Sequence, residues 1–213
     1  MVTKPNRLRY FLMDCAHFIY LVLWLWFRPR VIDATGNTTT PNWKGSGIVA
    51  ANHTGFSDPF LLGSVFWRRR MFFLTAKEVM ATPAREFWLK KAGCIKIDRS
   101  ISDMVAIRNC VTVCQQGNLL GMFPEGRIQT DSNTDAVKSG AILIALQSSA
   151  PILPLYSQKP NKWWQRRLVV MGEPFYPAEQ CAKKFPSMQD IQQLSAQLQT
   201  KIEECKKAYE SHH

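Results

Sequence analysis

Short apolar runs that alternate with longer helical segments constrain the fold of this chain more than any other feature. Runs with the length and composition of buried strands begin near residues 46, 71, 94, 119 and 151. Helical segments separate them, with a start signal at Asp58-Pro59 and a stop signal at Gly93. This alternation predicts an α/β fold with a mostly parallel central sheet and helices on both of its faces.

Three other segments complete the predicted organisation. Leu168–Met171 predicts a sixth strand, and Ser187–Tyr209 predicts an amphipathic helix. Thr35–Asn42 is rich in turn residues and predicts a linker without regular structure. We therefore expect an N-terminal helical segment at residues 1–30 and one α/β domain at residues 31–213.

The N-terminal segment is the most apolar part of the chain. Leu8–Phe27 has basic residues on both sides, and Trp24 and Trp26 lie near its end, as in an interfacial aromatic belt. Asp14 and His17 lie within it, and charge at the centre of a bilayer is costly. The pattern favours an interfacial or re-entrant membrane anchor over a clean span, and the alternative is a buried core helix.

The net charge indicates which binding partners the protein favours, and the cysteine spacing indicates its redox compartment. The formal net charge is +11, which favours an anionic partner such as nucleic acid, an anionic membrane, or a phosphorylated or CoA-like substrate. The six cysteines form no Cys-x-x-Cys pair, so their spacing suits neither a zinc ribbon nor a disulfide framework. Reduced thiols in a cytosol-facing protein are the interpretation that this spacing favours.

Polar side chains follow four of the predicted strands, at the point where each strand ends. These positions are Asn52-His53 with Asp58, Lys77-Glu78, Asp98-Arg99, and Glu125-Gly126-Arg127. Because functional groups gather at the carboxyl ends of strands in open α/β sheets, we expect a site at this edge.

His53 and Asp58 carry the most specific chemistry in this set. A carboxylate that fixes the tautomer of an imidazole makes the other ring nitrogen a general base. The alternative is a structural histidine in a turn, with Asp58 as a helix cap. The chain has no Gly-x-Ser-x-Gly elbow and no Gly-Lys-Ser/Thr phosphate loop. Its four histidines, two of them terminal, make a metal site improbable.

Three motifs together resemble the glycerolipid acyltransferases, a family that includes the 1-acylglycerol-3-phosphate (lysophosphatidic acid) acyltransferases. The motifs are His53-x-x-x-x-Asp58, Phe123-Pro124-Glu125-Gly126-Arg127 and Ala150-Pro151-Ile152-Leu153-Pro154-Leu155. The stretch from Lys77 to Arg99 is similar to the family's second block. The resemblance covers about half of the chain, from Gly47 to Tyr156.

The resemblance implies a role for each matching residue. His53 would be the general base, and Asp58 would orient it. The acceptor pocket would be formed by Glu125, Gly126 and Arg127, with added positive charge from Arg99 and Lys77. Pro154 would shape the acyl-chain or donor side.

One departure from the family pattern concerns Arg127. Many members have Phe-Pro-Glu-Gly-Thr-Arg, whereas here Arg127 follows Gly126 directly. This shift could turn the guanidinium to another face, so a surface salt bridge is the alternative for Arg127. Solvated surface charge is the alternative for Arg99 and for Lys77.

The resemblance also implies the substrates and the location. The expected reaction transfers a fatty acyl group from acyl-CoA or acyl-carrier protein to 1-acylglycerol 3-phosphate, without a metal or other cofactor and without nucleic acid. A lysophospholipid acceptor places the enzyme at the cytosolic face of a membrane, docked by residues 1–30 ahead of an acyltransferase domain at 31–213. Arg68–Arg70 and Lys162–Arg167 would extend the docking surface.

Two alternatives stay open at this point. The first keeps the acyltransferase chemistry but changes the acceptor to glycerol 3-phosphate, another lysophospholipid or an amino-acid-derived lysolipid. The second is a non-catalytic basic protein that binds an anionic membrane or nucleic acid.

Overall fold

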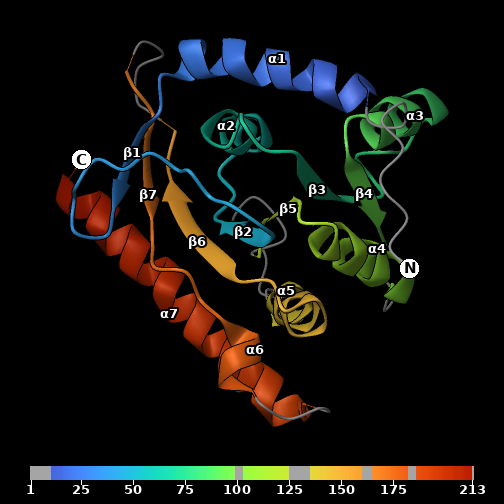
Figure 1. Ribbon diagram of the computed structural model, residues 1–213, viewed down its shortest axis with the longest axis vertical. Helices are drawn as coiled ribbons and strands as arrows, with labels where there is room; N and C mark the ends of the chain where they lie inside the picture. Colours follow the sequence, from blue (N-terminus) through green and yellow to red (C-terminus); the bar gives the residue numbers. More distant parts are fainter. Residues whose placement is uncertain (1–10, 99–102, 125–134, 160–164, 182–185, 213) are drawn as a thin grey trace.

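A seven-stranded sheet organises the chain, and its strand order is β1-β7-β6-β2-β5-β3-β4. The computed structural model describes residues 11–98, 103–124, 135–159, 165–181 and 186–212 (Figure 1). The strands are β1 (Arg30–Asp33), β2 (Gly47–Ala51), β3 (Met71–Ala76), β4 (Cys94–Ile97), β5 (Leu119–Met122), β6 (Ile152–Ser157) and β7 (Leu168–Met171). The helices are α1 (Phe11–Phe27), α2 (Asp58–Val65), α3 (Pro83–Lys91), α4 (Met104–Gln115), α5 (Asp135–Ser148), α6 (Pro177–Gln180) and α7 (Met188–His212).

The central strands are parallel, as the alternation of strands and helices predicts. β2 pairs in parallel with β5 on one side and with β6 on the other, so that Val49 lies beside both Gly121 and Leu153. β3 continues the parallel set and pairs with β5 and β4. The β6–β7 pair is antiparallel, and β1 pairs in parallel with β7, so these two strands run against the other five.

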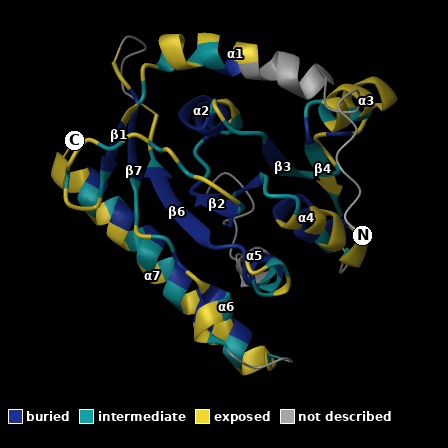
Figure 2. Cartoon of the chain, in the orientation of Figure 1, coloured by how far each residue is buried: buried dark blue, intermediate teal, exposed yellow. Residues whose placement is uncertain are grey.

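Helices cover both faces of the sheet, which confirms the predicted architecture. Ile48 and Ala50 point into a core shared with α4, α5 and α7. The alternate residues, Val49 and Ala51, point into a second core shared with α2. Because successive side chains of a strand point to opposite faces, one five-residue strand contributes to both cores. Figure 2 shows the buried sheet between the two helical layers.

α1 lies along the outer side of α2 rather than against the sheet (Figure 1). Tyr20 of α1 is buried, and its ring lies directly over Gly63 of α2. A larger group of its described side chains is exposed: Phe18, Ile19, Val22, Trp24, Leu25 and Trp26. Among the described residues, no helix is both long and apolar enough to cross a membrane.

β1 was not predicted from the sequence. Its apolar part consists of Val31 and Ile32 alone, between the charged residues Arg30 and Asp33. So short a run has no detectable period, and pairing with β7 in the folded sheet is what makes it a strand. Asp33 then closes a turn by accepting hydrogen bonds from the backbone amides of the two residues Thr35 and Asn37.

The reversed direction of β7 shapes the edge of the sheet where the predicted site lies. The carboxyl ends of β2, β5 and β6 meet at this edge, as in other parallel sheets. β7 begins there, because Val169 pairs with Ser157 at the end of β6. Arg167, the residue that precedes β7, therefore lies beside Ser57 and Asp58, which follow the parallel strand β2.

Candidate active site

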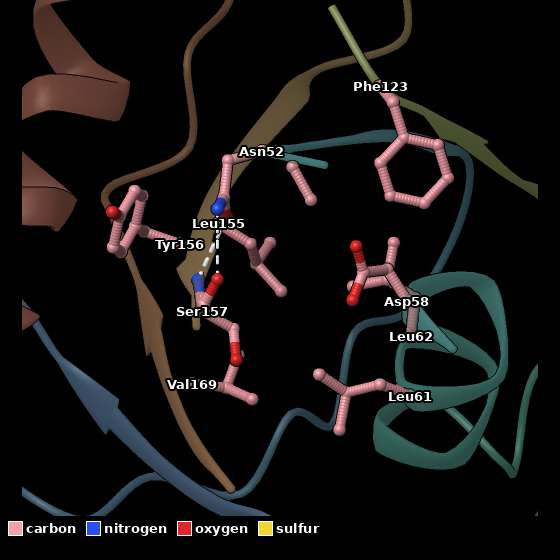
Figure 3. A pocket seen from close by; sticks show the side chains of 10 residues that line it. Asn52, Asp58, Leu61, Leu62, Phe123, Leu155, Tyr156, Ser157 and Val169 are labelled. Carbon is pink, nitrogen blue, oxygen red and sulfur yellow. Dashed lines mark hydrogen bonds between the residues drawn. The ribbon is translucent and has the colours of Figure 1, made fainter. Parts of the chain in front are cut away.

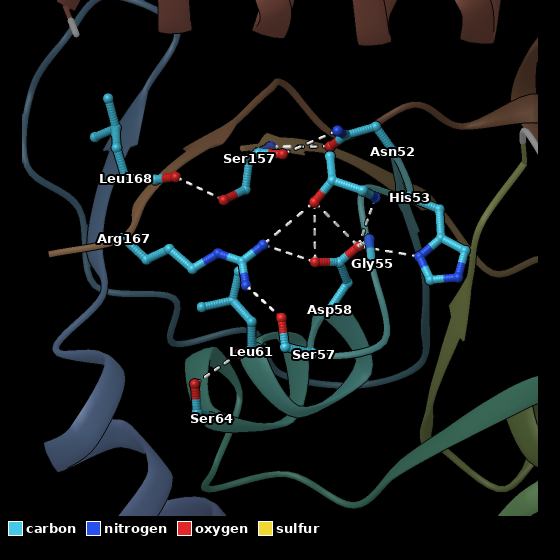
Figure 4. Close-up of polar contacts among 11 residues, drawn as sticks. Asn52, His53, Gly55, Ser57, Asp58, Leu61, Ser64, Ser157, Arg167 and Leu168 are labelled. Atoms are coloured by element: carbon cyan, nitrogen blue, oxygen red, sulfur yellow. Dashed lines mark hydrogen bonds and ion pairs between the residues drawn. The ribbon is translucent and has the colours of Figure 1, made fainter. Parts of the chain in front are cut away.

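His53 and Asp58 are brought together by the turn that joins β2 to α2. β2 ends at Ala51, and Asp58 is the first residue of α2. His53 Nδ1 lies 3.0 Å from Asp58 Oδ2 (Figure 4). An ionised carboxylate only accepts hydrogen bonds, so Nδ1 carries the proton and Nε2 is the basic nitrogen of the neutral ring.

Asp58 does not act as a helix cap. The cap residue of α2 is Ser57, whose side chain makes no capping hydrogen bond. The Asp58 carboxylate instead bonds back to the turn: the amide of Thr54 donates to Oδ2 at 2.6 Å and the amide of Gly55 at 2.8 Å. The same oxygen therefore fixes the turn and the imidazole of His53 together.

The electrostatic surroundings keep Asp58 ionised although it is only 4% exposed. Burial acts to raise the pKa of this carboxyl. Hydrogen bonds from His53, from two backbone amides and from Arg167 outweigh burial and lower the pKa from 3.8 to about 2. The carboxylate therefore keeps its charge across the physiological pH range and orients His53 throughout it.

Phe123, which follows β5, forms one wall of the histidine site. Its ring stacks on the His53 imidazole with centroids 4.4 Å apart and planes inclined by 21°. The side chain of His53 stays 20% exposed. Within the described part of the chain, Nε2 of His53 has no hydrogen-bond partner. A ring held on one side by stacking and at Nδ1 by a carboxylate leaves Nε2 open to a substrate.

Asn52 fixes the carboxyl end of β2 to the end of β6. Its side-chain amide donates to the Ser157 carbonyl, and its side-chain oxygen accepts from the Ser157 amide, both at 2.9 Å. The pair is drawn in Figures 3 and 4. Since His53 follows Asn52 directly, this double hydrogen bond anchors the strand end from which the imidazole projects.

A small, mainly apolar pocket adjoins the Asp58 carboxylate (Figure 3). Its apolar lining comes from α2, the end of β5, β6 and β7, and includes Leu61, Leu62, Phe123, Leu155 and Val169. An apolar wall therefore adjoins the polar His53–Asp58 pair on the Asp58 side.

Four of the described thiols are deactivated by burial, so they do not compete with His53 as the reactive group. Burial raises the pKa of the thiols of Cys110, Cys114 and Cys205 to about 12. Burial also raises the pKa of Cys94. A thiol with a raised pKa is a poor nucleophile at neutral pH. Among the described residues, no group of three or more His, Cys, Asp or Glu side chains is placed to hold a metal ion.

The comparison with known families identifies the chemistry. A family model described as Acyltransferase matches residues 31–158, which is more than half of the chain. The chain belongs to the acyltransferase family. This result confirms the resemblance carried by the three motifs and the expectation of an enzyme, and it removes the non-catalytic alternative.

Relatives of this acyltransferase carry a consistent name. A 1-acyl-sn-glycerol-3-phosphate acyltransferase from Bacillus subtilis is 24% identical over 163 residues, or 74% of this chain and 79% of the relative. One from Borreliella burgdorferi is 27% identical over 148 residues, or 68% and 58% of the two chains. One from Limnanthes alba is 30% identical over 151 residues, which are 68% of this chain and 51% of the relative.

A solved structure shares the fold of this acyltransferase. The 1-acyl-sn-glycerophosphate acyltransferase PlsC from Thermotoga maritima superposes with a TM-score of 0.58 at 18% identity. The match covers 96% of this chain and 84% of that one. It supports the mostly parallel α/β architecture over nearly the whole chain.

Lys77 lies at the end of β3 and is engaged in an ion pair. Its Nζ lies 2.7 Å from Oδ2 of Asp98, which follows β4. The hydrogen bond to Asp98 raises the pKa of Lys77. The structure thus joins two of the predicted strand-end groups to each other, and a substrate role for Lys77 stays a prediction.

The other predicted binding residues have different outcomes. Arg99, Glu125, Gly126 and Arg127 lie outside the described residues, although Phe123 places the start of their motif against His53. Pro154 is buried in β6, where its carbonyl accepts from the Gly172 amide at 2.9 Å. It is not part of the pocket beside Asp58, and its role on the donor side stays a prediction.

Two cations at this edge were not assigned to the site from the sequence. Arg167 was predicted to face membrane headgroups, but it is 3% exposed and its Nη2 lies 2.6 Å from Asp58 Oδ1. Lys159, two residues beyond β6, lies against Gly55 of the turn between β2 and α2. The Arg167 contact depends on the reversed direction of β7, which residue order alone does not reveal.

Proposed function

We propose that this acyltransferase transfers a fatty acyl group to the free hydroxyl of 1-acylglycerol 3-phosphate, with acyl-CoA or acyl-carrier protein as donor, and so forms phosphatidic acid. The names of the relatives in Bacillus, Borreliella and Limnanthes support the acceptor. The geometry that carries the proposal is the His53–Asp58 pair, in which the carboxylate holds Nδ1 of His53 while the ring stays partly exposed. No acyl-enzyme is needed for this reaction.

The reaction follows from the two ring nitrogens of His53. Nε2 removes the proton from the acceptor hydroxyl while the hydroxyl oxygen forms a bond to the thioester carbonyl carbon. Asp58 stabilises the imidazolium through Nδ1. The carbon–sulfur bond then breaks, and the imidazolium returns the proton to the departing thiolate. One ester and one free thiol result, and His53 is neutral again.

The acceptor lipid and the exposed apolar side of α1 lead us to propose a membrane-associated enzyme working at the cytosolic face. α1 exposes Trp24 and Trp26 just before the basic residues Arg28 and Arg30. Aromatic rings beside cationic side chains suit the interface of an anionic bilayer. Both proposed donors are cytosolic thioesters, so the open side of His53 would meet them there.

The test measures acyl transfer by purified protein with detergent-dispersed 1-acylglycerol 3-phosphate and with each donor. His53→Ala and Asp58→Asn should lower kcat by at least about 10²-fold, the usual effect of losing a general base. His212→Ala, a change of an exposed histidine on α7, is the matched control and should keep the wild-type rate.

Two results would contradict the proposal. Full activity of His53→Ala would exclude His53 as the base. Absence of transfer by the wild type with this acceptor would exclude the proposed substrate, and the same assay with glycerol 3-phosphate, other lysophospholipids and amino-acid-derived lysolipids would then identify the acceptor.

A further inference from the structure

Arg167 is a buried arginine whose guanidinium is committed to the turn between β2 and α2. Nη2 donates to Asp58 Oδ1 at 2.6 Å, and Nη1 donates to Ser57 Oγ at 2.9 Å (Figure 4). Among the described residues, its buried Nε has no hydrogen-bond partner. An unsatisfied buried donor is costly, and the hydrogen bonds from Nη1 and Nη2 to the turn offset part of that cost.

The two oxygens of Asp58 have different main partners, although the Thr54 hydroxyl contacts both, at 3.2 and 3.4 Å. Oδ2 receives His53 Nδ1 and the amides of Thr54 and Gly55. Oδ1 receives Arg167 from the opposite side, together with the longer contact from the Thr54 hydroxyl at 3.2 Å. The guanidinium therefore prevents the carboxylate from rotating, and Oδ2 stays directed at the imidazole.

The main chain of Arg167 shows what positions the guanidinium. Its carbonyl accepts from the Arg30 amide at 2.9 Å, at the first residue of β1. Its side chain then extends from the start of β7 toward α2. Residue 167 is thus placed by the β1–β7 pair, the part of the sheet that runs against the other strands.

The charge of Arg167 also matters for His53. With His53 neutral, Asp58 and Arg167 have no net charge as a pair, and proton uptake by His53 leaves a net charge of +1 in a largely buried site. Without Arg167 the imidazolium would face an unshared carboxylate and would be more stable. The other charged group against this turn within the described residues is Lys159, while Glu125 and Arg127 follow Phe123 outside them.

We propose that Arg167 is a positioning residue for the His53–Asp58 pair: it holds the carboxylate in its productive orientation and opposes protonation of the imidazole. The proposal rests on the general-base role of His53 given above. A purely structural ion pair would explain the burial, but it would leave the pH dependence of catalysis unchanged when Arg167 is replaced.

Steady-state kinetics separate these two roles. Arg167→Met should lower kcat by about 10-fold to 100-fold, the range seen when an outer partner of a functional group is removed, with little change in KM. The acid limb of the pH–rate profile should move to higher pH. Arg167→Lys, which keeps the charge, should restore the profile in part. Arg108→Met, at an exposed arginine on α4, is the matched control with wild-type kinetics.

A double-mutant cycle shows whether Arg167 acts through Asp58. In the Asp58→Asn background, adding Arg167→Met should change kcat by no more than about twofold, because the group it acts on is already lost. Independent, multiplying losses would overturn the proposal. The double variant leaves neither charge buried alone, so this comparison holds even if Arg167→Met by itself is too unstable to assay.

Titration of the His53 ring by NMR provides a readout that does not depend on turnover. The midpoint should lie at higher pH in Arg167→Met than in the wild type and in Arg108→Met. An unchanged midpoint would overturn the proposal. If the midpoint is higher in Arg167→Met than in the wild type but the wild type transfers no acyl group, the proposed function is contradicted and the role of Arg167 is not.

Discussion

At the scale of single residues, Asp58 links the stability of the turn to the chemistry of the site. The spacing between His53 and Asp58 is a local property, so the sequence predicts their pairing, and the structure places them 3.0 Å apart. Arg167 lies 109 positions away from Asp58 and reaches it only because β7 is reversed. Long-range partners of this kind depend on strand direction, which the sequence pattern does not encode.

The lowered pKa of Asp58 predicts how stability changes with pH. Its value falls from 3.8 to about 2 on folding, so the ionised carboxylate stabilises the folded state above about pH 4. This contribution, on the order of 2 kcal/mol, is lost as the pH falls from about 4 to 2. Urea unfolding of wild type and Asp58→Asn should give a difference in unfolding free energy that shrinks over this range. A difference that stays constant would contradict the assignment.

At the scale of secondary-structure elements, strong local signals were enough to predict most helices and strands. The helix start predicted at Asp58-Pro59 is the start of α2, and the stop predicted at Gly93 lies just after the end of α3. β1 could not be predicted, because two apolar residues show no period. The direction of β7 could not be predicted either, since a four-residue apolar run looks the same in parallel and antiparallel sheets.

The packing of α1 on α2 depends on the absence of a side chain at Gly63. A Cβ placed there would lie 2.5 Å from the ring of Tyr20. Gly63→Ala should therefore lower the unfolding free energy by about 1 to 3 kcal/mol through overpacking. Gly140→Ala, in α5, should raise it by about 0.5 to 1 kcal/mol, because beyond the backbone of its own helix no atom of the described residues lies within 4 Å of the added Cβ.

Thermal melts of the two glycine variants test this packing directly. Opposite shifts in Tm would show that α1 and α2 form one packed unit through Tyr20. A Tm for Gly63→Ala equal to or above that of the wild type would contradict the close contact between the two helices.

At the scale of the whole molecule, the two helical layers differ in what they expose. Alternation of strands and helices predicts a parallel sheet with two covered faces, but not a strand order that places β2 between β5 and β6. The layer of α2 carries α1 on its outer side, and Phe56 of the turn between β2 and α2 is 78% exposed. The layer of α4 and α7 packs on the opposite face.

This asymmetry predicts which face of the molecule would dock in the proposed membrane association. Ile19, Val22 and Trp26 recur at helical spacing along α1 and are all exposed, so they form one apolar stripe. Ile19→Gln with Trp26→Gln should weaken binding to vesicles that contain anionic lipid by about tenfold or more, because two large apolar side chains would no longer enter the interface.

The matched control lies on the other layer. Met104 and Val105 of α4 are 55% and 71% exposed, against 55% for Ile19 and 73% for Trp26, so a double glutamine variant there changes two apolar side chains of similar fractional exposure. Co-sedimentation with vesicles should be unchanged for the α4 variant and reduced for the α1 variant. Undiminished, wild-type binding by both variants would mean that α1 does not dock. An equal loss in both would mean that binding follows total exposed apolar surface, with no preferred face, and the stripe on α1 would then have no special role.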